Sequence, residues 1–454
     1  MRSAIRAGVV PAYILLCIVL GGSTQGYWGA AILQLLAIAI IGWSLLTPDR
    51  LHLSGPTKGL FAIAALIVLL PIVQLVPLPP GLWAAIPGRN PIAEGYRLLG
   101  QPLPWLPISL TPYDTMATIL TLLPPLAVLA GMLIGGAYRA SWIVIAVLLG
   151  TFAAVLLGAL QVSSGDPVQS PWYFYSRTNH GVATGFFANS NHLATLLVAS
   201  IPMLFALVSE FRKRSKNASS ESALMLMAIG AFLVLLVGIF LTGSLAVLLL
   251  ALPVVLISAT LLMPETIRLR GPLIAVAVIS IAAMGVVYMT PLHDKLMSSN
   301  QTSFESRQII WSDSVPAIGD HIALGSGVGS FQRVYRQYED HSAVTRTFVN
   351  HAHNDYIEII METGIPGLLL LAAFFLWWGS RAVPIWRSAA LDRYAVAASI
   401  ASGAVLIHSL VDYPLRTAAI SSIMAACLAK MARPRVQEDS ETPDLWPSTR
   451  HAAI

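Results

Sequence analysis

The sequence has few charged residues and almost no cysteine. Of its 454 residues, 11% are charged and 56% are hydrophobic, and the mean hydropathy is +0.72. A water-soluble domain of this size could not hide so much apolar surface, so a soluble enzyme is excluded. The two cysteines, Cys17 and Cys427, fall in apolar runs at opposite ends of the chain. Neither a disulfide framework nor a thiolate metal site is therefore expected.

Three further features are missing from the sequence. No internal repeat is evident, so an inverted-repeat transporter gains no support. Arg2 and Arg6 precede the first apolar run, but no small-residue cleavage site follows, which predicts an uncleaved first helix. There is no Asp-x-Asp step and no tight group of histidines and carboxylates, so we expect no metal and no cofactor. The pair His351 and His353, on a face that carries several other histidines, is the best argument for a metal.

Long apolar runs dominate the sequence instead. Twelve of them come close to the length that a helix needs to cross the hydrocarbon layer. They lie near 8–22, 29–46, 59–77, 116–135, 140–161, 192–209, 223–241, 245–263, 272–290, 364–383, 394–411 and 415–432. The sequence therefore predicts an all-α protein, a polytopic membrane helix bundle of about twelve transmembrane helices.

Basic residues gather in alternate loops between these runs. The loops contain Arg50 and Lys58, Arg139, Arg212 to Lys216, Arg268 and Arg270, and Arg381, Arg387 and Arg393. Under the positive-inside rule, that side of the membrane is cytoplasmic. The basic residues near both ends of the chain join the same side, which requires an even number of spans. Both termini are predicted to be cytoplasmic.

The outward side is expected to carry the long loops. They cover about 78–115, 162–191 and 291–363, and loops of such length are usually functional or separately folded. We assign residues 1–433 to the membrane domain. Residues 434–454 are polar and contain proline, which predicts a disordered cytoplasmic tail.

The last outward loop ends in the segment from His351 to Glu358, which reads HAHNDYIE. Asp355 and Glu358 have the spacing of a capping-box-like helix start, which gives both carboxylates a structural explanation. Gly364 is expected to end that helix and begin the next. His353 lies just before the cap, where backbone N–H groups favour a neutral imidazole, a possible general base. By residue type alone, such a loop histidine is more often solvated than catalytic.

The surrounding motif resembles a known family. His353-Asn354, followed after nine residues by Gly364-x-x-Gly367, is similar to the signature of the bacterial O-antigen ligase and polymerase family. Other stretches that look like this family are Arg177 to Gly181, Gly185 to Ala194 with Asn191, Ser306 to Trp311 with Arg307, Ser109 to Thr115, and His408 to Arg416. One departure is that Thr242-Gly-Ser is followed by Leu245, where the family often carries an arginine.

The resemblance implies transfer of a glycan from a polyprenyl-diphosphate-linked donor to a sugar hydroxyl, with inversion, at the outer face of the bacterial inner membrane. It implies that His353 is the base. Arginines suit the leaving diphosphate because they stay protonated and can bind phosphate in bidentate fashion. The candidates are Arg177, Arg307 and Arg416, and the supporting motif residues are Asn354, Gly364, Gly367 and Asn191. For Arg416, an ion pair with Asp412 four residues earlier is an alternative explanation.

Several alternatives stay open at this point. The acceptor could be a glycan, as in a polymerase, or lipid A-core, as in a ligase, with membrane lipid around the protein and a chain-length regulator as a further partner. A nucleic-acid partner is not expected. A multi-pass transporter or a lipid-linked glycan flippase is the competing class, and a transporter would be expected to carry ionisable residues deep in its spans. The apolar runs carry none near their centres.

Overall fold

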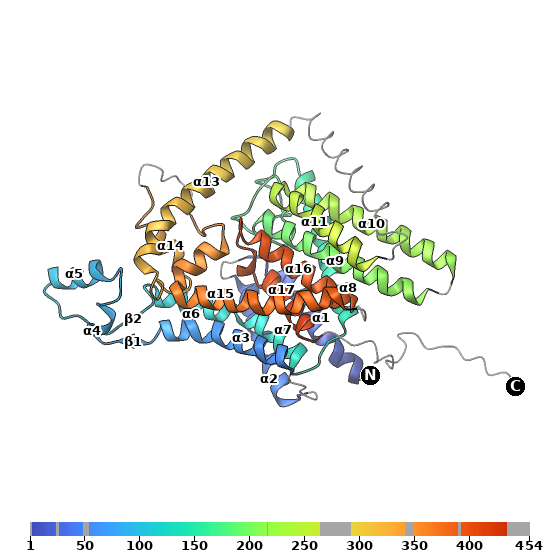
Figure 1. Ribbon diagram of the computed structural model, residues 1–454. Helices are drawn as coiled ribbons and strands as arrows, with labels where there is room; N and C mark the ends of the chain where they lie inside the picture. Colours follow the sequence, from blue (N-terminus) through green and yellow to red (C-terminus); the bar gives the residue numbers. More distant parts are fainter. Residues whose placement is uncertain are drawn as a thin grey trace.

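The computed structural model describes residues 2–23, 27–48, 54–215, 217–263, 292–340, 349–388 and 392–433. In these ranges the protein is almost entirely helical, which confirms the all-α class (Figure 1). The helices are α1 (Arg2–Leu20), α2 (Trp28–Leu46), α3 (Gly55–Gln74), α4 (Pro80–Trp83), α5 (Asn90–Leu98), α6 (Pro112–Thr121), α7 (Leu123–Leu133), α8 (Ala140–Ser163), α9 (Ser190–Arg214), α10 (Ala218–Thr242), α11 (Leu245–Leu262), α13 (Leu292–His321), α14 (Phe331–Tyr335), α15 (Asp355–Arg387), α16 (Arg393–His408) and α17 (Ala418–Ala432), with a short 3-10 helix η1 (Pro414–Arg416). The strands β1 (Pro77–Leu78) and β2 (Leu106–Pro107) pair antiparallel.

The predicted membrane spans correspond to helices wherever the structure describes them. Eight helical stretches in the described part of the chain are long and apolar enough to cross a membrane, and three shorter apolar helices accompany them. Together they account for every predicted span except 272–290, which lies outside the described residues, as does the tail 434–454. The chain is a multi-pass membrane protein, and the count of twelve spans stays a prediction.

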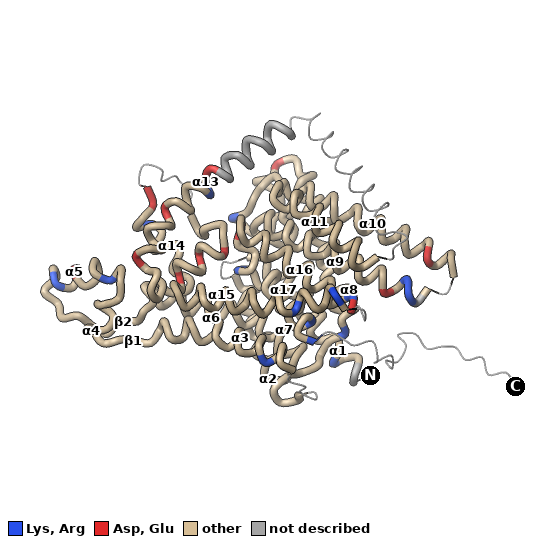
Figure 2. Tube along the Cα trace, in the orientation of Figure 1, with Lys and Arg blue, Asp and Glu red and all other residues tan. Residues whose placement is uncertain are grey.

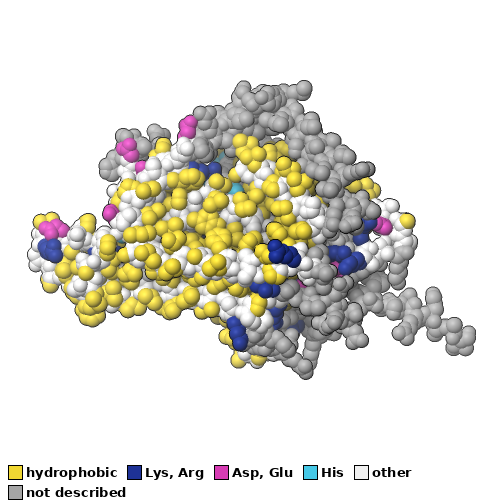
Figure 3. Space-filling view, in the orientation of Figure 1, with side chains coloured by type: hydrophobic (Ala, Val, Ile, Leu, Met, Phe, Trp, Pro, Cys, Tyr) yellow, Lys and Arg dark blue, Asp and Glu magenta, His cyan; other side chains and the backbone are white. Residues whose placement is uncertain are grey.

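Helix α9 forms the centre of the bundle. It packs against α8, α10, α11 and α16, and nearly all of its apolar stretch is buried. Helices α2, α3 and α10 leave most of their apolar surface exposed. Figure 3 shows hydrophobic side chains covering much of one face of the molecule, as expected of a surface that meets lipid.

The expected outward loops contain regular structure and are attached to the bundle. Helices α13 and α14 occupy much of 291–363, and the segment 78–115 carries β2, α4 and α5. Gln74, at the end of α3 and buried, binds both α15 and the segment before α14. Its Nε2 donates to Glu362 O at 2.9 Å and to Leu324 O at 3.2 Å, and its Oε1 accepts from Val328 N at 3.0 Å. This single amide fixes the outward segment against two helices.

The break expected at Gly364 is present as a kink inside α15. Gly364 has φ 60° and ψ −147°, a conformation that is essentially restricted to glycine. A Cβ at this position would lie 2.4 Å from Ile322 O, at the end of α13. The kink therefore lets α13 pack closely on α15, and Ile365 N donates to the same carbonyl at 2.8 Å.

Figure 2 shows several Lys and Arg residues near the end of the molecule at which the N-terminus lies, and others on α5 and beside α13. Many of the acidic residues lie around α13 and α14, and others lie on α10. The cytoplasmic position of the termini stays a prediction of the positive-inside rule.

The orientation predicts which introduced thiols a membrane-impermeant reagent can reach. Lys213, exposed at the end of α9, should be cytoplasmic, and Gln337, exposed beyond α14, should be outside. Cys17 and Cys427 are buried, so the unmodified protein serves as the unreactive background. In spheroplasts, an impermeant maleimide should label Gln337→Cys at once and Lys213→Cys only after lysis. The opposite labelling order would reverse the topology.

Candidate active site

Asn354 shapes the segment that carries His353. Its Oδ1 accepts from Tyr356 N at 3.0 Å and from Ile357 N at 3.1 Å, which caps α15. Its Nδ2 donates to Leu410 O at 2.8 Å, beyond the end of α16. The prediction that Asp355 occupies the cap is therefore wrong by one position. Asn354 has the better geometry because its amide can both accept from the helix and donate to the neighbouring turn.

His353 has an unusual backbone conformation. Its φ is +49°, and within the described part of the chain it is the one non-glycine residue with positive φ. Such a conformation costs about 1–3 kcal/mol and persists only where neighbouring structure enforces it. The Asn354 cap and a hydrogen bond of 3.0 Å from Asp355 N to Ser409 O supply that enforcement. They direct the His353 ring toward the turn that follows α16.

At that turn, Asp412 is surrounded by potential cations. It is fully buried, with its Oδ1 3.5 Å from His192 Nε2 and 3.8 Å from His353 Nδ1. Its Oδ2 lies 3.8 Å from Arg307 Nη2. Tyr413 N donates to Oδ1 at 2.8 Å. The structure thus brings together His353 and Arg307, two residues that lie 46 positions apart in the sequence.

Burial and nearby charges give His353 and Asp412 different protonation states at neutral pH. Burial lowers the pKa of His353 to about 4, and the nearby Asp412 carboxylate offsets only part of that effect. Burial also raises the pKa of Asp412, but His192, His353 and His408 outweigh it and hold that pKa far below its usual range. At neutral pH the site therefore contains a neutral imidazole beside an ionised carboxylate, the arrangement that a general base requires.

Arg416 has different partners from those expected. Asp412, four residues earlier, does not pair with it. Arg416 Nη1 lies 3.1 Å from Glu358, Nη2 lies 3.2 Å from Glu362, and Nε lies 3.6 Å from Asp355. The carboxylates of Asp355 and Glu358 thus form buried ion pairs, which the capping explanation had missed. Their spacing along α15 places all three on one face of that helix.

A cavity of about 850 Å³ opens beside this ionic group. One part of its wall is polar and contains Arg177, Asn350, His351, Glu358, Glu362 and Arg416. Another part is apolar and contains Ile67, Leu70, Leu370, Leu371, Met424 and Leu428, from α3, α15 and α17. A cavity with this division suits an amphiphilic ligand with a polar head and a hydrocarbon chain.

Tyr413 contacts His353 and two residues of the cavity wall, His351 and Asn350. Its ring centroid lies 5.0 Å from that of His353 and 4.1 Å from that of His351. Its hydroxyl accepts a hydrogen bond from Asn350 Nδ2 at 3.2 Å. Since Asn350 and His351 line the cavity, Tyr413 connects the cavity wall to the base.

The remaining motif residues lie in different parts of the structure, and only some of them line the cavity. Gly364 forms the α15 kink and Gly367 lines the cavity. Asn191 lies in the first turn of α9, where its backbone N–H donates to the cap Asn189 at 2.9 Å. It is Asn189 whose Nδ2 reaches Asp412 Oδ1, at 3.5 Å. Arg177 lines the cavity.

Sequence reasoning missed four of the residues around the base: Asp412, His192, Asn189 and Tyr413. One signal was available for the first of them, because His408 and Asp412 are ionisable residues four apart at the outer end of a predicted span.

Among the described His, Cys, Asp and Glu residues, none form a group with metal-holding geometry. A metal-free site stays a prediction.

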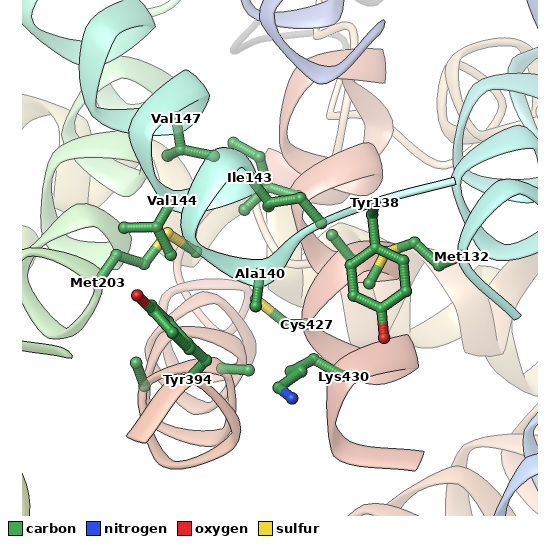
Figure 4. Close-up of a pocket in the computed structure, with 14 residues that line it drawn as sticks. Met132, Tyr138, Ala140, Ile143, Val144, Val147, Met203, Tyr394, Cys427 and Lys430 are labelled. Atoms are coloured by element: carbon green, nitrogen blue, oxygen red, sulfur yellow. The ribbon is translucent and has the colours of Figure 1, made fainter. Parts of the chain in front are cut away.

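A second pocket lies elsewhere in the bundle (Figure 4). It has a volume of about 30 Å³ between Tyr138, Tyr394, Cys427 and Lys430. A space this small has room for only a few water molecules, so no glycan or lipid fits there. Lys430 is instead paired with Asp392 at 2.6 Å.

Comparison with known proteins agrees with the motif resemblance. Residues 230–372 match a family described as O-antigen ligase, and this range contains Arg307, His353, Asn354, Gly364 and Gly367. No curated protein matches the chain significantly. Residues 230–372 are thus similar to the O-antigen ligase family, which supports the resemblance seen in the motif around His353.

Proposed function

We propose that this membrane protein transfers a glycan from a polyprenyl diphosphate carrier to a sugar hydroxyl on the outward side of the inner membrane, without a metal ion. Its family acts in cell-surface glycan biosynthesis on lipid-linked glycans and their acceptors. The observation that carries the proposal is the neutral His353 beside the ionised Asp412, next to an amphiphilic cavity.

The residues allow a balanced transfer step. His353 Nδ1 faces Asp412, which leaves Nε2 for the acceptor hydroxyl. Nε2 takes the hydroxyl proton while the hydroxyl oxygen attacks the anomeric carbon from the side opposite the diphosphate. The bond from that carbon to the diphosphate oxygen breaks, the diphosphate leaves with the electron pair, and the anomeric centre inverts. Asp412 stabilises the imidazolium that forms, as the carboxylate does in an Asp-His pair.

Positive charge for the leaving diphosphate comes from Arg307 and Arg177. Arg307 lies on the Asp412 side of the site, and Arg177 is in the cavity wall. Guanidinium groups can bind phosphate oxygens in bidentate fashion. The prediction that Arg416 is a third ligand gains no support, because its guanidinium is already paired with three carboxylates. We assign Arg416 a structural role, in which it pairs with the three carboxylates on one face of α15.

The apolar wall of the cavity supports a polyprenyl carrier. Hydrocarbon side chains from α3, α15 and α17 line it, so an isoprenoid chain would leave water on binding. The same site accommodates a lipid-linked glycan or lipid A-core as acceptor, and a polymerase and a ligase would share it. Association with a chain-length regulator remains part of the proposal.

Replacing His353 should stop glycan transfer without removing the protein from the membrane. His353→Ala should lower the rate by about 10²–10⁴-fold, the usual contribution of a positioned base. Lipid-linked single repeat units would then accumulate for a polymerase, and lipid-linked long chains for a ligase. His180→Ala, which changes an exposed histidine bonded to Pro167 O, is the matched control. Wild-type turnover by His353→Ala would remove the base assignment.

The pH profile should reflect the lowered pKa of His353. Because that pKa is about 4, the imidazole is the free base throughout the neutral range, and transfer should stay constant from about pH 7 to 5 and fall only toward pH 4. Asp412 raises this pKa, so Asp412→Asn should weaken the base and reduce transfer at every pH. An acid limb near pH 6.5 in the wild-type protein would contradict the buried neutral base.

Arg307 should require the guanidinium as well as the charge. Arg307→Ala should reduce transfer about 100-fold and Arg307→Lys about tenfold, since lysine keeps the charge but loses the planar fork. Arg333→Ala is the control, because Arg333 is exposed and pairs with Asp114 at 2.7 Å. Transfer rates of purified protein with lipid-linked donor and excess chelator would decide both this assignment and the metal question. Near-normal rates for both Arg307 variants would exclude Arg307 from the site.

A further inference from the structure

The cavity wall contains a second histidine that is paired with a carboxylate. His351 lines the cavity of about 850 Å³, and its Nδ1 lies 2.9 Å from Glu358 Oε1. His353 is not among the described residues that line this cavity. The side chain of His351 is 16% exposed, whereas that of Glu358 is 1% exposed. The cavity wall therefore presents an imidazole that is anchored from behind by a buried carboxylate.

The pairing with Glu358 determines which nitrogen of His351 faces a ligand. Glu358 also accepts from Ala352 N at 3.1 Å and pairs with Arg416 Nη1 at 3.1 Å. A carboxylate surrounded by donors acts as an acceptor, so His351 Nδ1 donates to it. Within the described part of the chain, Nε2 has no hydrogen-bond partner, and it is not one of the buried unpaired atoms. Nε2 is therefore accessible to a ligand in the cavity.

The charges of the cavity wall show what His351 can contribute. Arg177 and Arg416 line the cavity together with three carboxylates of α15. With these groups ionised and His351 neutral, the wall has an excess of one negative charge, which disfavours an anionic head group. An imidazolium at His351 removes that excess. Imidazole is the side chain whose charge ordinarily changes between pH 5 and 8, so a bound anion can induce the positive charge by the uptake of one proton.

We propose that His351 binds the diphosphate of the lipid-linked donor through its Nε2–H, as an imidazolium that forms when the donor enters the cavity. This inference rests on the proposed function. The proton comes from water and stays on His351, so this contact breaks no bond of the donor. A cationic N–H makes a short, strong hydrogen bond to a phosphate oxygen. The rings of His351 and His353 both pack on Tyr413, with centroid distances of 4.1 and 5.0 Å, so a diphosphate at His351 lies beside the base.

Proton uptake makes the affinity for the donor depend on pH. As the pH falls from 8 to 6, the imidazolium becomes more accessible and the donor should bind more tightly. The effect is on affinity, so transfer at saturating donor keeps the pH profile that His353 sets. The charged and titratable groups that contact His351 or share its cavity wall are Asp355, Glu358 and Glu362 of α15, Arg416 of η1, Tyr413, His353 and Arg177.

Equilibrium binding to purified full-length protein between pH 8 and pH 6 tests the assignment. One probe is undecaprenyl diphosphate that carries N-acetylglucosamine, whose two phosphates stay ionised over this range, and the other is undecaprenol, which has no phosphate. Wild-type affinity for the diphosphate lipid should rise about tenfold from pH 8 to pH 6. His351→Gln, which keeps a neutral N–H donor, should lose this rise and bind the diphosphate lipid about tenfold more weakly at pH 6. Both proteins should bind undecaprenol equally at every pH.

Two control variants address other groups that could take up the proton. His180→Ala changes an exposed histidine bonded to Pro167 O, and Asp355→Asn removes a carboxylate from the same cavity wall. Both should keep the wild-type pH dependence, and thermal melting verifies that each variant is folded. If Asp355→Asn loses the pH dependence and His351→Gln keeps it, the assignment of His351 is overturned.

The remaining outcomes separate this inference from the proposed function. Equal wild-type affinity for the diphosphate lipid at pH 8 and pH 6, or wild-type binding by His351→Gln, overturns the assignment of His351. The proposed function then stands if Arg307→Ala weakens binding. Slower transfer by His351→Gln at unchanged affinity would place His351 in proton transfer and also overturn the assignment. If the diphosphate lipid binds no more tightly than undecaprenol, both the assignment and the proposed function are overturned.

Discussion

Two hydrogen bonds across the end of α16 hold the candidate site together. Asn354 Nδ2 donates to Leu410 O, and Asp355 N donates to Ser409 O. They join the residues just after His353 to the turn that contains Asp412. Because both acceptors are main-chain carbonyls of one tight turn, the position of His353 relative to Asp412 is determined largely by the backbone. The left-handed conformation of His353 follows from the same constraint.

The start of α15 separates two electrostatic environments. Before the helix, His353 belongs to a group in which three histidines and Arg307 surround one carboxylate, Asp412. On the helix, three carboxylates surround one guanidinium, Arg416. Removing one partner from a buried ion pair costs about 3–5 kcal/mol, so neither group exchanges partners readily. The first group therefore has an excess of potential cations and the second an excess of carboxylates.

The amino-acid sequence was sufficient for features that depend on local pattern. Apolar runs predicted the spans, and Gly364 predicted the break in α15, because hydrocarbon length and backbone conformation are properties of short segments. The motif around His353 led to the family. Capping rules, in contrast, explained the carboxylates of Asp355 and Glu358 only as parts of a helix start, from residues three positions apart. They could not reveal Arg416, which lies 58 residues beyond Glu358 and meets it only in the fold.

The same limit applies to the surroundings of the base. His192 begins α9, Arg307 lies in α13 and Asp412 follows α16, so their meeting depends on how three distant helices pack. Gln74 was likewise unremarkable in the sequence, yet it binds the end of α3 to α15 and to the segment before α14. Periodicity and composition carry no information about such contacts, which is why the residues that surround His353 were not predicted.

The arrangement of the cavity also bears on how a lipid carrier reaches the base. Its apolar wall comes from α3, α15 and α17, of which α3 leaves most of its apolar surface exposed. Each methylene group brought out of the bilayer into water costs about 0.8 kcal/mol, so a long isoprenoid chain cannot approach through the outward aqueous side. Entry of the proposed carrier from within the membrane would avoid that cost and would bring its polar head to Arg177 in the cavity wall.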